Sequence, residues 1–338
     1  MMRIPLAIAA SLLCAVAGGA DAVLAPPEHR RGEDQTYLTF PEWFLVHSPA
    51  EYAAFLKHDD PHDFPLLEHV GQLWSSYADV IRSTRRYPFN GEYHVMINVI
   101  GVSTTVEYGL KSLYEGTFGR LAATARRGER TAEDEFAAAT AQRYVDFIRV
   151  RPWYEFDFID QLKALWNLPL AGGSYVRKVE RRFALTSELL VKAAYGKLIE
   201  IATRSSFEAP PKPVTAVVFD RTPIESPELP DLKVLQVFGD GTTLVTMPRY
   251  EGFTAYAESL ARQGLKFVEI AGNRNVILVS LLTSDAALPG WAGQVVIEQP
   301  YLTRPGWRRV AVAVPIERLH QTAVAESPSL QIEHIYDF

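Results

Sequence analysis

The densest group of side chains that could bind a metal ion lies at residues 58–63, which read His-Asp-Asp-Pro-His-Asp. Imidazole nitrogens and carboxylate oxygens together bind zinc or a harder divalent cation, and the candidate ligands are His58, Asp60 and His62. The same residue types are favoured in turns and helix caps, and no further ligand follows at a diagnostic spacing. We therefore expect a solvated connection between two helices and no cofactor, with a metal site as the alternative.

Glu107 and His94 are the residues best suited to acid–base catalysis, because a carboxylate in apolar surroundings tends to have a raised pKa. On one helix, however, they would lie about 20 Å apart, so they cannot act on the same atom. We therefore favour structural pairing of Glu107 with a cation from a neighbouring helix. The obvious partners are Arg177, Lys178, Arg181 and Arg182.

The sequence lacks the common catalytic motifs. It contains no Gly-x-Ser-x-Gly, no phosphate loop ending in Gly-Lys-Ser/Thr and no Gly-x-Gly-x-x-Gly, which disfavours the common hydrolases, kinases and dinucleotide-binding enzymes. The chain has 34 Lys+Arg against 40 Asp+Glu and a net charge of −6. This balance disfavours a nucleic-acid partner, since such proteins work through a basic surface.

The segment from Tyr93 to Leu113 is predicted to form a helix with almost no charge around its circumference. Its apolar stripe comprises Val95, Val99, Val102, Val106, Leu110 and Leu113. A helix of this kind is normally buried among other helices, so we expect a central bundle helix. A segment that dips into a membrane is the alternative, although Asn98 and Glu107 would be costly in lipid.

Residues 151–158 read Arg-Pro-Trp-Tyr-Glu-Phe-Asp-Phe and alternate aromatic with acidic side chains. Aromatic residues near helices usually belong to a core, and we favour that interpretation. The alternative is an amphipathic pocket or a membrane interface. The candidate ligand-binding residues are Trp43, Asn98, Glu107, Trp153 and Tyr154.

Residues 37–205 are predicted to form an all-α helical bundle. Ser48 to Glu51 has the pattern of a capping box that begins one helix, and Thr131 to Asp134 caps another. Apolar spacing predicts helices at 48–56, 66–81, 131–148, 158–166 and 176–203. Residues 23–36 are expected to be a tether, and the proline-rich residues 206–213 a linker.

Residues 214–338 change to the periodicity of strands. The expected strands are 214–219, 234–238, 242–247, 266–270, 276–282, 294–299, 309–314 and 331–336. The segments LVTMP (244–248) and VAVAVP (310–315) each precede a helix and a short closing strand that contains a glutamate. We infer a duplicated ββαβ unit that forms one antiparallel sheet, a ferredoxin-like α+β layer. Two unrelated hairpin–helix units are the alternative.

Residues 1–22 have the pattern of a secretory signal peptide, with Arg3, an uncharged stretch at 4–19 and Ala20-Asp21-Ala22. The stretch is shorter than the roughly 20 residues that span a bilayer. We therefore expect cleavage after Ala22 and a periplasmic protein, with an uncleaved inner-membrane anchor as the alternative. Cleavage would remove Cys14, the only cysteine, and with it disulfide or thiol chemistry.

Five motifs are spread over the chain: TFPEWF (39–44), SPAEY (48–52), GQLWSSY (71–77), FIRVRPWYEF (147–156) and RKVERRFALT (177–186). They resemble motifs of an uncharacterised family of exported or membrane-anchored bacterial proteins. The resemblance covers the chain from Thr39 to about Ala271. It implies an envelope setting and a shared fold, and it brings no activity, ligand or catalytic residue.

These features predict an exported, non-catalytic protein. We expect it to bind an apolar or amphipathic ligand, such as a lipid, or an envelope partner. Association with a membrane surface is one way in which it could do so. The first alternative is a hydrolase or lyase that uses Glu107, His94 and residues 58–63. The second is a structural scaffold of the envelope. The oligomeric state is left open.

Overall fold

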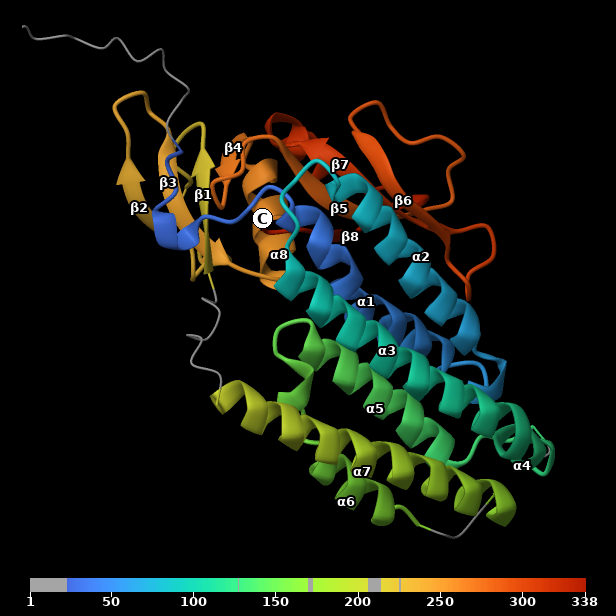
Figure 1. The fold of residues 1–338 in the computed structure, drawn as a ribbon. Helices are drawn as coiled ribbons and strands as arrows, with labels where there is room; N and C mark the ends of the chain where they lie inside the picture. Colours follow the sequence, from blue (N-terminus) through green and yellow to red (C-terminus); the bar gives the residue numbers. More distant parts are fainter. Residues whose placement is uncertain (1–22, 127, 170–172, 206–213, 225) are drawn as a thin grey trace, which may run out of the picture.

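The computed structural model describes residues 23–126, 128–169, 173–205, 214–224 and 226–338 (Figure 1). The predicted signal peptide, residues 1–22, and the predicted linker, residues 206–213, lie outside the described residues. Helices occupy the first half of the chain and two antiparallel sheets the second. The predicted α+β class, with the helical region first, is therefore confirmed.

The helices of the first half are α1 (Gln35–Phe55), α2 (Leu66–Thr84), α3 (Gly91–Tyr114), α4 (Arg120–Thr124), α5 (Ala132–Ile148), α6 (Phe158–Trp166) and α7 (Tyr175–Ser205). The helices predicted at 66–81, 93–113, 131–148, 158–166 and 176–203 are present in the structure, whereas α1 begins earlier than predicted and the short α4 was not predicted. A π-helical turn, Glu115–Gly119, joins α3 to α4. The capping box that begins α5 is confirmed, because the Thr131 side chain accepts a hydrogen bond from the Asp134 amide and the Asp134 carboxylate accepts one from the Thr131 amide.

The helix start predicted at Ser48 is wrong, because α1 runs continuously through Pro41 and Pro49. A proline removes one helical hydrogen bond, but surrounding contacts can hold the helix together across it. The Ser48 hydroxyl is buried and hydrogen-bonds the Tyr108 hydroxyl at 2.8 Å rather than capping a helix. Tertiary packing along α1 therefore outweighs the local capping pattern.

The predicted tether at 23–36 is also corrected, since these residues are held against the second half of the chain. The amides of Leu24 and Ala25 donate to the buried Glu269 carboxylate at 3.0 and 2.6 Å. Ala25 packs with residues of the first sheet, and residues 35 and 36 already belong to α1. The polar composition that predicted a tether says nothing of these distant contacts.

The second half consists of two four-stranded antiparallel sheets with the same topology. The first has the order β2-β3-β1-β4 and the second β6-β7-β5-β8. Their strands are β1 (Val214–Phe219), β2 (Lys233–Val237), β3 (Thr243–Pro248), β4 (Phe267–Ile270), β5 (Val276–Thr283), β6 (Gln294–Pro300), β7 (Arg308–Pro315) and β8 (Leu330–Ile335). Helix α8 (Glu251–Arg262) precedes β4, and the short α9 (Leu319–Thr322) precedes β8.

The matching strand orders agree with the inferred duplication, but the single sheet we expected is replaced by two. Within the described residues, each unit contributes three strands before its helix and one after it, and these four pair with one another. The first strand of each unit occupies a central position. Because it pairs on both edges within its own unit, each unit completes a separate sheet.

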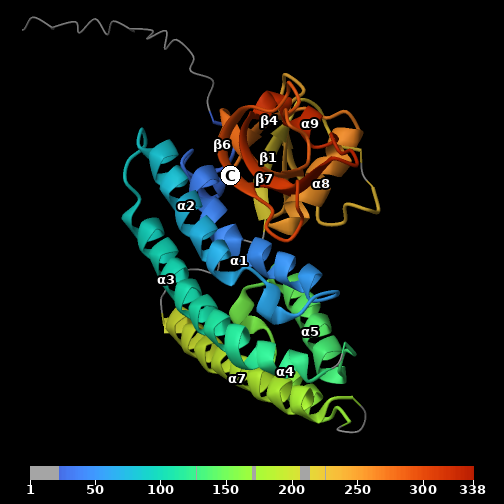
Figure 2. The same cartoon turned by 90° about the vertical axis from the view of Figure 1, so that its right-hand side faces the viewer.

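The largest buried core connects α1 to both sheets. Tyr37, Phe40 and Trp43 of α1 pack in one cluster with buried residues of the strands and of α8. Figure 2 shows α3 and α7 along the edge of the molecule, on the side of α1 away from the sheets. Helix α1 therefore joins the two halves, and α3 and α7 form an outer layer.

Candidate functional site

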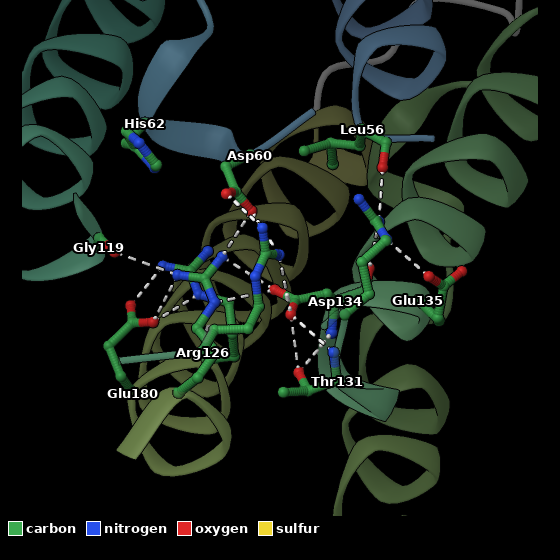
Figure 3. Close-up of polar contacts among 12 residues, drawn as sticks. Leu56, Asp60, His62, Gly119, Arg126, Thr131, Asp134, Glu135 and Glu180 are labelled. Atoms are coloured by element: carbon green, nitrogen blue, oxygen red, sulfur yellow. Dashed lines mark hydrogen bonds and ion pairs between the residues drawn. The ribbon is translucent and has the colours of Figure 1, made fainter. Parts of the chain in front are cut away.

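A buried ionic network lies where α7 begins and holds that end of the helical half together (Figure 3). The spacing of Arg177, Lys178, Arg181 and Arg182 places these cations on one face of α7, and all four are buried. The Arg177 guanidinium contacts the Asp134 carboxylate at 2.9 Å and the Asp60 carboxylate at 3.3 Å. Arg181 forms two hydrogen bonds with the Glu115 carboxylate, at 3.0 and 2.8 Å.

Asp134 shows how the network balances its charges. Burial by itself would raise the pKa of Asp134, but the Arg177 charge and hydrogen bonds from Thr131 lower the pKa overall. Arg182 pairs with the buried Glu133 at 2.8 Å, and the Lys178 ammonium donates to the Pro169 carbonyl at 3.0 Å. Each buried cation therefore meets a carboxylate or a carbonyl, which is the condition for burying charge at low cost.

Of the candidate metal ligands, Asp60 belongs to this ionic network, whereas His58 and His62 do not contact Asp60 among the described contacts. The two carboxylate oxygens of Asp60 accept hydrogen bonds from Arg126 at 2.8 and 2.7 Å. His62 lies 3.4 Å from Asp63, and His58 is exposed. Among the described residues, no three His, Cys, Asp or Glu side chains come together as a metal site. Asp60 thus has a structural role between arginines.

Glu107 has a different partner from those predicted. Its carboxylate is 45% exposed and lies 3.2 Å from the Lys192 ammonium. Helices α3 and α7 are antiparallel neighbours, with a second pair between Lys111 and Glu188 at 3.0 Å. This register places Lys192 opposite Glu107 and Arg181 opposite Glu115, so the predicted cations lie too close to the start of α7 to reach Glu107.

The other candidate site residues lie in separate places. The Tyr77 hydroxyl links His94 and Asn98, at 2.8 Å from His94 Nδ1 and 3.1 Å from the Asn98 amide nitrogen. Trp43 is buried and stacks on His334 with ring centroids 3.4 Å apart. Trp153, beside Tyr154, stacks on Tyr195 of α7 at 5.4 Å. The five predicted ligand-binding residues therefore do not form one site.

The apolar stripe of α3 is exposed, so the expectation of a buried central helix is wrong. Its six residues, Val95, Val99, Val102, Val106, Leu110 and Leu113, are 53–68% exposed. Helix α3 buries its opposite face, including Gly101 and Tyr108. At Gly101 the Trp74 indole approaches so closely that a Cβ would lie 2.8 Å from it. The uncharged sequence allowed either face to be buried, and packing against α2 selected the less apolar one.

Exposed apolar side chains continue from α3 onto the neighbouring elements. On the turn after α3, on α4 and on α7 they are Phe118, Leu121, Val176, Val179, Phe183, Leu190, Val191, Leu198 and Ile201. The Tyr114 and Phe183 rings, 6.1 Å apart, bring α3 and α7 together at one end. We call these nine residues and the α3 stripe the apolar face. Exposed apolar surface of this extent is typical of a docking site.

A second cluster, which sequence reasoning missed, lies where α1 and α2 meet the second sheet. We call it the histidine junction: His47, Glu51, His69, Arg309, Glu333 and His334. Arg309 donates two hydrogen bonds to the Glu333 carboxylate, at 2.6 and 2.7 Å. His47 lies 3.5 Å from Glu333, and His69 lies 3.7 Å from Glu51. The one sequence signal was the glutamate predicted inside each closing strand.

Burial dominates the electrostatics of the histidine junction. It lowers the pKa of His47 and of His69, each to about 3, and lowers the pKa of His334 well below its ordinary value. Burial would also raise the pKa of Glu333, but Arg309 and His47 bring it down to about 2. The junction therefore contains neutral histidines beside one charged pair at neutral pH.

Two surface hollows lie away from the predicted ligand site. One is lined by residues 32–35 and 87–92, and the other by Glu326, Ser327, Gln331 and Ile332. Neither includes Asn98, Glu107 or the aromatic candidates. The idea of a guest held in a cavity beside the middle of α3 gains no support from them, and the exposed apolar face becomes the candidate functional surface.

Replacing Glu107 by glutamine is expected to lower the free energy of unfolding by less than about 1 kcal/mol, because the pair with Lys192 is partly exposed. Glu188→Gln is the matched comparison. It should cost more, since the Glu188 carboxylate contacts both Lys111 and Lys192. Urea unfolding measures both. A larger loss for Glu107→Gln, or loss of a measurable hydrolase activity in it, would contradict the structural role.

No described helix is both long enough and apolar enough to cross a membrane. Comparison of the chain with family models, with curated proteins and with solved structures finds no match.

Proposed function

We propose that the protein is an exported, non-catalytic protein that binds the surface of a lipid bilayer through the apolar face. The observation that carries the proposal is the exposed run of valine and leucine on α3, next to exposed apolar residues on α7. Helices with a wide apolar surface bind in the plane of a bilayer, with that surface among the acyl chains near the headgroups. The lipid is then the amphipathic ligand expected from the sequence.

Two features favour a bilayer over a protein partner as the occupant. The chain outside the described residues begins with the predicted export segment, which would bring the protein to a membrane. The exposed stripe on α3 carries no charge, and the neighbouring Glu107 is paired with Lys192. Phe118 and Phe183 add aromatic side chains of the kind that membrane-surface helices insert.

The double variant Val99→Asp/Val106→Asp is expected to weaken binding to phosphatidylcholine vesicles by about tenfold for each substitution, because each places a charge where apolar surface should enter lipid. Both valines are exposed, so the fold should be retained. Vesicle flotation of the chain that begins at Val23 measures the binding.

The matched control is Val150→Asp/Val324→Asp, which changes two exposed valines outside the apolar face. It should bind vesicles like the unchanged protein. Equal binding by all three proteins would rule out the apolar face as the lipid site, and no binding by the unchanged protein would rule out the function. Binding only to vesicles that carry envelope proteins would identify a protein partner instead.

A further inference from the structure

The histidine junction brings titratable groups from both halves of the chain into one buried contact. Helix α1 contributes His47 and Glu51, α2 contributes His69, β7 contributes Arg309, and β8 contributes Glu333 and His334. Two further charged groups act from its edge: Arg149, which follows α5, and Glu251, which begins α8 and pairs with Arg149 at 3.3 Å. The junction is thus one polar contact between the helices and the second sheet, in addition to the hydrogen bonds of Gln72 with Pro300 and of Thr36 with Leu278.

We propose that the histidine junction is an acid-sensitive latch, in which protonation of His47 and His69 loosens α1 and α2 from the second sheet while the rest of the helical half stays folded. This inference is independent of lipid binding, since none of its residues belongs to the apolar face. It concerns how the two halves of the protein are held together.

The nearest carboxylates lie 3.5 Å from His47 and 3.7 Å from His69, which is longer than an ordinary hydrogen bond. Nε2 of His47 and both ring nitrogens of His69 are buried without a hydrogen-bond partner. The His69 ring stacks on Phe64 at 4.6 Å and meets Phe44 edge-on at 6.3 Å, so its surroundings are largely aromatic. An imidazolium there would lose hydration without gaining a hydrogen bond, which is costly.

Three of the four oxygens of the nearby carboxylates already accept hydrogen bonds, whereas Glu51 Oε2 is buried without a partner among the described residues. The Glu333 oxygens accept hydrogen bonds from Arg309 and from the Ser280 hydroxyl. One Glu51 oxygen accepts hydrogen bonds from the Thr303 amide and hydroxyl, at 2.8 and 3.0 Å. Burial raises the pKa of Glu51, so in mild acid it carries less negative charge than an ordinary glutamate. Arg309 adds repulsion toward both histidines.

The sign of the pH effect follows from the direction of these shifts. The pKa of each histidine is about 3 in the closed junction, against 6.5 when the ring is exposed. At any pH between about 3 and 6.5, the two histidines therefore bind more protons in the open state than in the closed state. Acid for this reason favours opening. Glu333 protonates only at lower pH, because its pKa is about 2 in the closed junction and 4.5 when exposed. The raised pKa of Glu51 acts in the opposite direction, because the closed junction holds its proton more tightly than the open state. Between pH 6.5 and 4.5 the two histidines together outweigh this single carboxyl group.

Opening would break identifiable polar contacts together with the apolar packing of α1 against the second sheet. The Thr303 amide donates to Glu51, and the side chains of Gln72 and Gln299 hydrogen-bond across the contact between α2 and β6. The helical half has its own support in the ionic network. There the pKa of Asp134 is lowered by Arg177 despite burial, so those pairs persist in mild acid.

Hydrogen exchange of the chain that begins at Val23, read between about pH 6.5 and 4.5, tests the latch. Protection at residues 299–303 is expected to fall by about tenfold per pH unit for each histidine that titrates on opening. Protection in α7 should change much less. Loss of protection in α7 with the same pH slope would overturn the proposal, because it would indicate acid unfolding of the whole protein.

The variant His69→Phe should make the loss of hydrogen-exchange protection at residues 299–303 less steep, by about one factor of ten per pH unit. The reason is that phenylalanine cannot be protonated. His47→Gln, which keeps a polar side chain, provides a second test that does not depend on the folding of the first variant. His58→Gln removes an exposed histidine outside the junction and should leave the slope unchanged. Unchanged slopes in both junction variants would also overturn the proposal.

Discussion

Replacing Arg177 by methionine is expected to lower the free energy of unfolding by about 3–5 kcal/mol, the usual cost of removing one partner from a buried ion pair. The Arg177 side chain is fully buried and contacts the carboxylates of Asp60, Asp134 and Glu180, and it donates to the Gly119 carbonyl. Methionine fills similar space but removes the central guanidinium, which leaves Asp60 and Asp134 with Arg126 alone and Glu180 with Arg181 alone among their described cations. Chemical denaturation gives the midpoint and the free energy.

Arg82→Met is the matched control, because the Arg82 side chain is 63% exposed and pairs only with the nearby Asp79 among its described contacts. Its loss should cost less than about 1 kcal/mol. If Arg177→Met cost no more than Arg82→Met, the ionic network would not be what holds α7 to the rest of the helical half.

Replacing Gly293 by alanine is expected to destabilise the second sheet by about 3 kcal/mol, the upper end of the usual cost of overpacking. A Cβ at this position would lie 1.8 Å from the carbonyl oxygen of Ala313 in β7. This oxygen belongs to the backbone, so it cannot move aside as the end of a flexible side chain could. The β6–β7 pairing, which begins at Gln294 opposite Ala313, would have to separate.

Gly290→Ala tests the same change in the same loop, where a Cβ would have nothing within 4 Å. It should leave the thermal unfolding temperature nearly unchanged or slightly raised, since alanine restricts the unfolded chain. If both variants were equally stable, the close approach at Gly293 would carry no energetic weight.

The individual elements follow from local sequence patterns. The predicted bounds of α6 at 158–166 and of β1 at 214–219 agree with the structure residue for residue. The capping pattern at Thr131 and the repeated strand–helix–strand order also hold. These signals act within a few residues, through hydrogen bonds and side-chain periodicity, so a single sequence contains them in full.

The face of α3 that is buried does not follow from such patterns. An uncharged helix has no polar side that must point to solvent. The choice depends on Trp74 meeting Gly101 and on Ser48 meeting Tyr108. Both contacts join residues that are distant in the sequence, and they leave the valine stripe outside. The candidate docking surface was therefore visible as a pattern but assigned to the interior.

For the charged residues, too, the sequence predicts which side chains share a helix face but not which partners they meet. The sequence marks four cations at the start of α7, and their helical spacing predicts that they share a face. Their partners, among them Asp60, Glu115 and Asp134, come from separate connections of the chain. The histidine junction likewise joins His47, His69 and Glu333 from three distant segments. The sequence alone determined where helices and strands form, because those interactions are local. Tertiary structure decided which surfaces stay exposed and which charges pair, because burial depends on contacts between segments far apart in the chain.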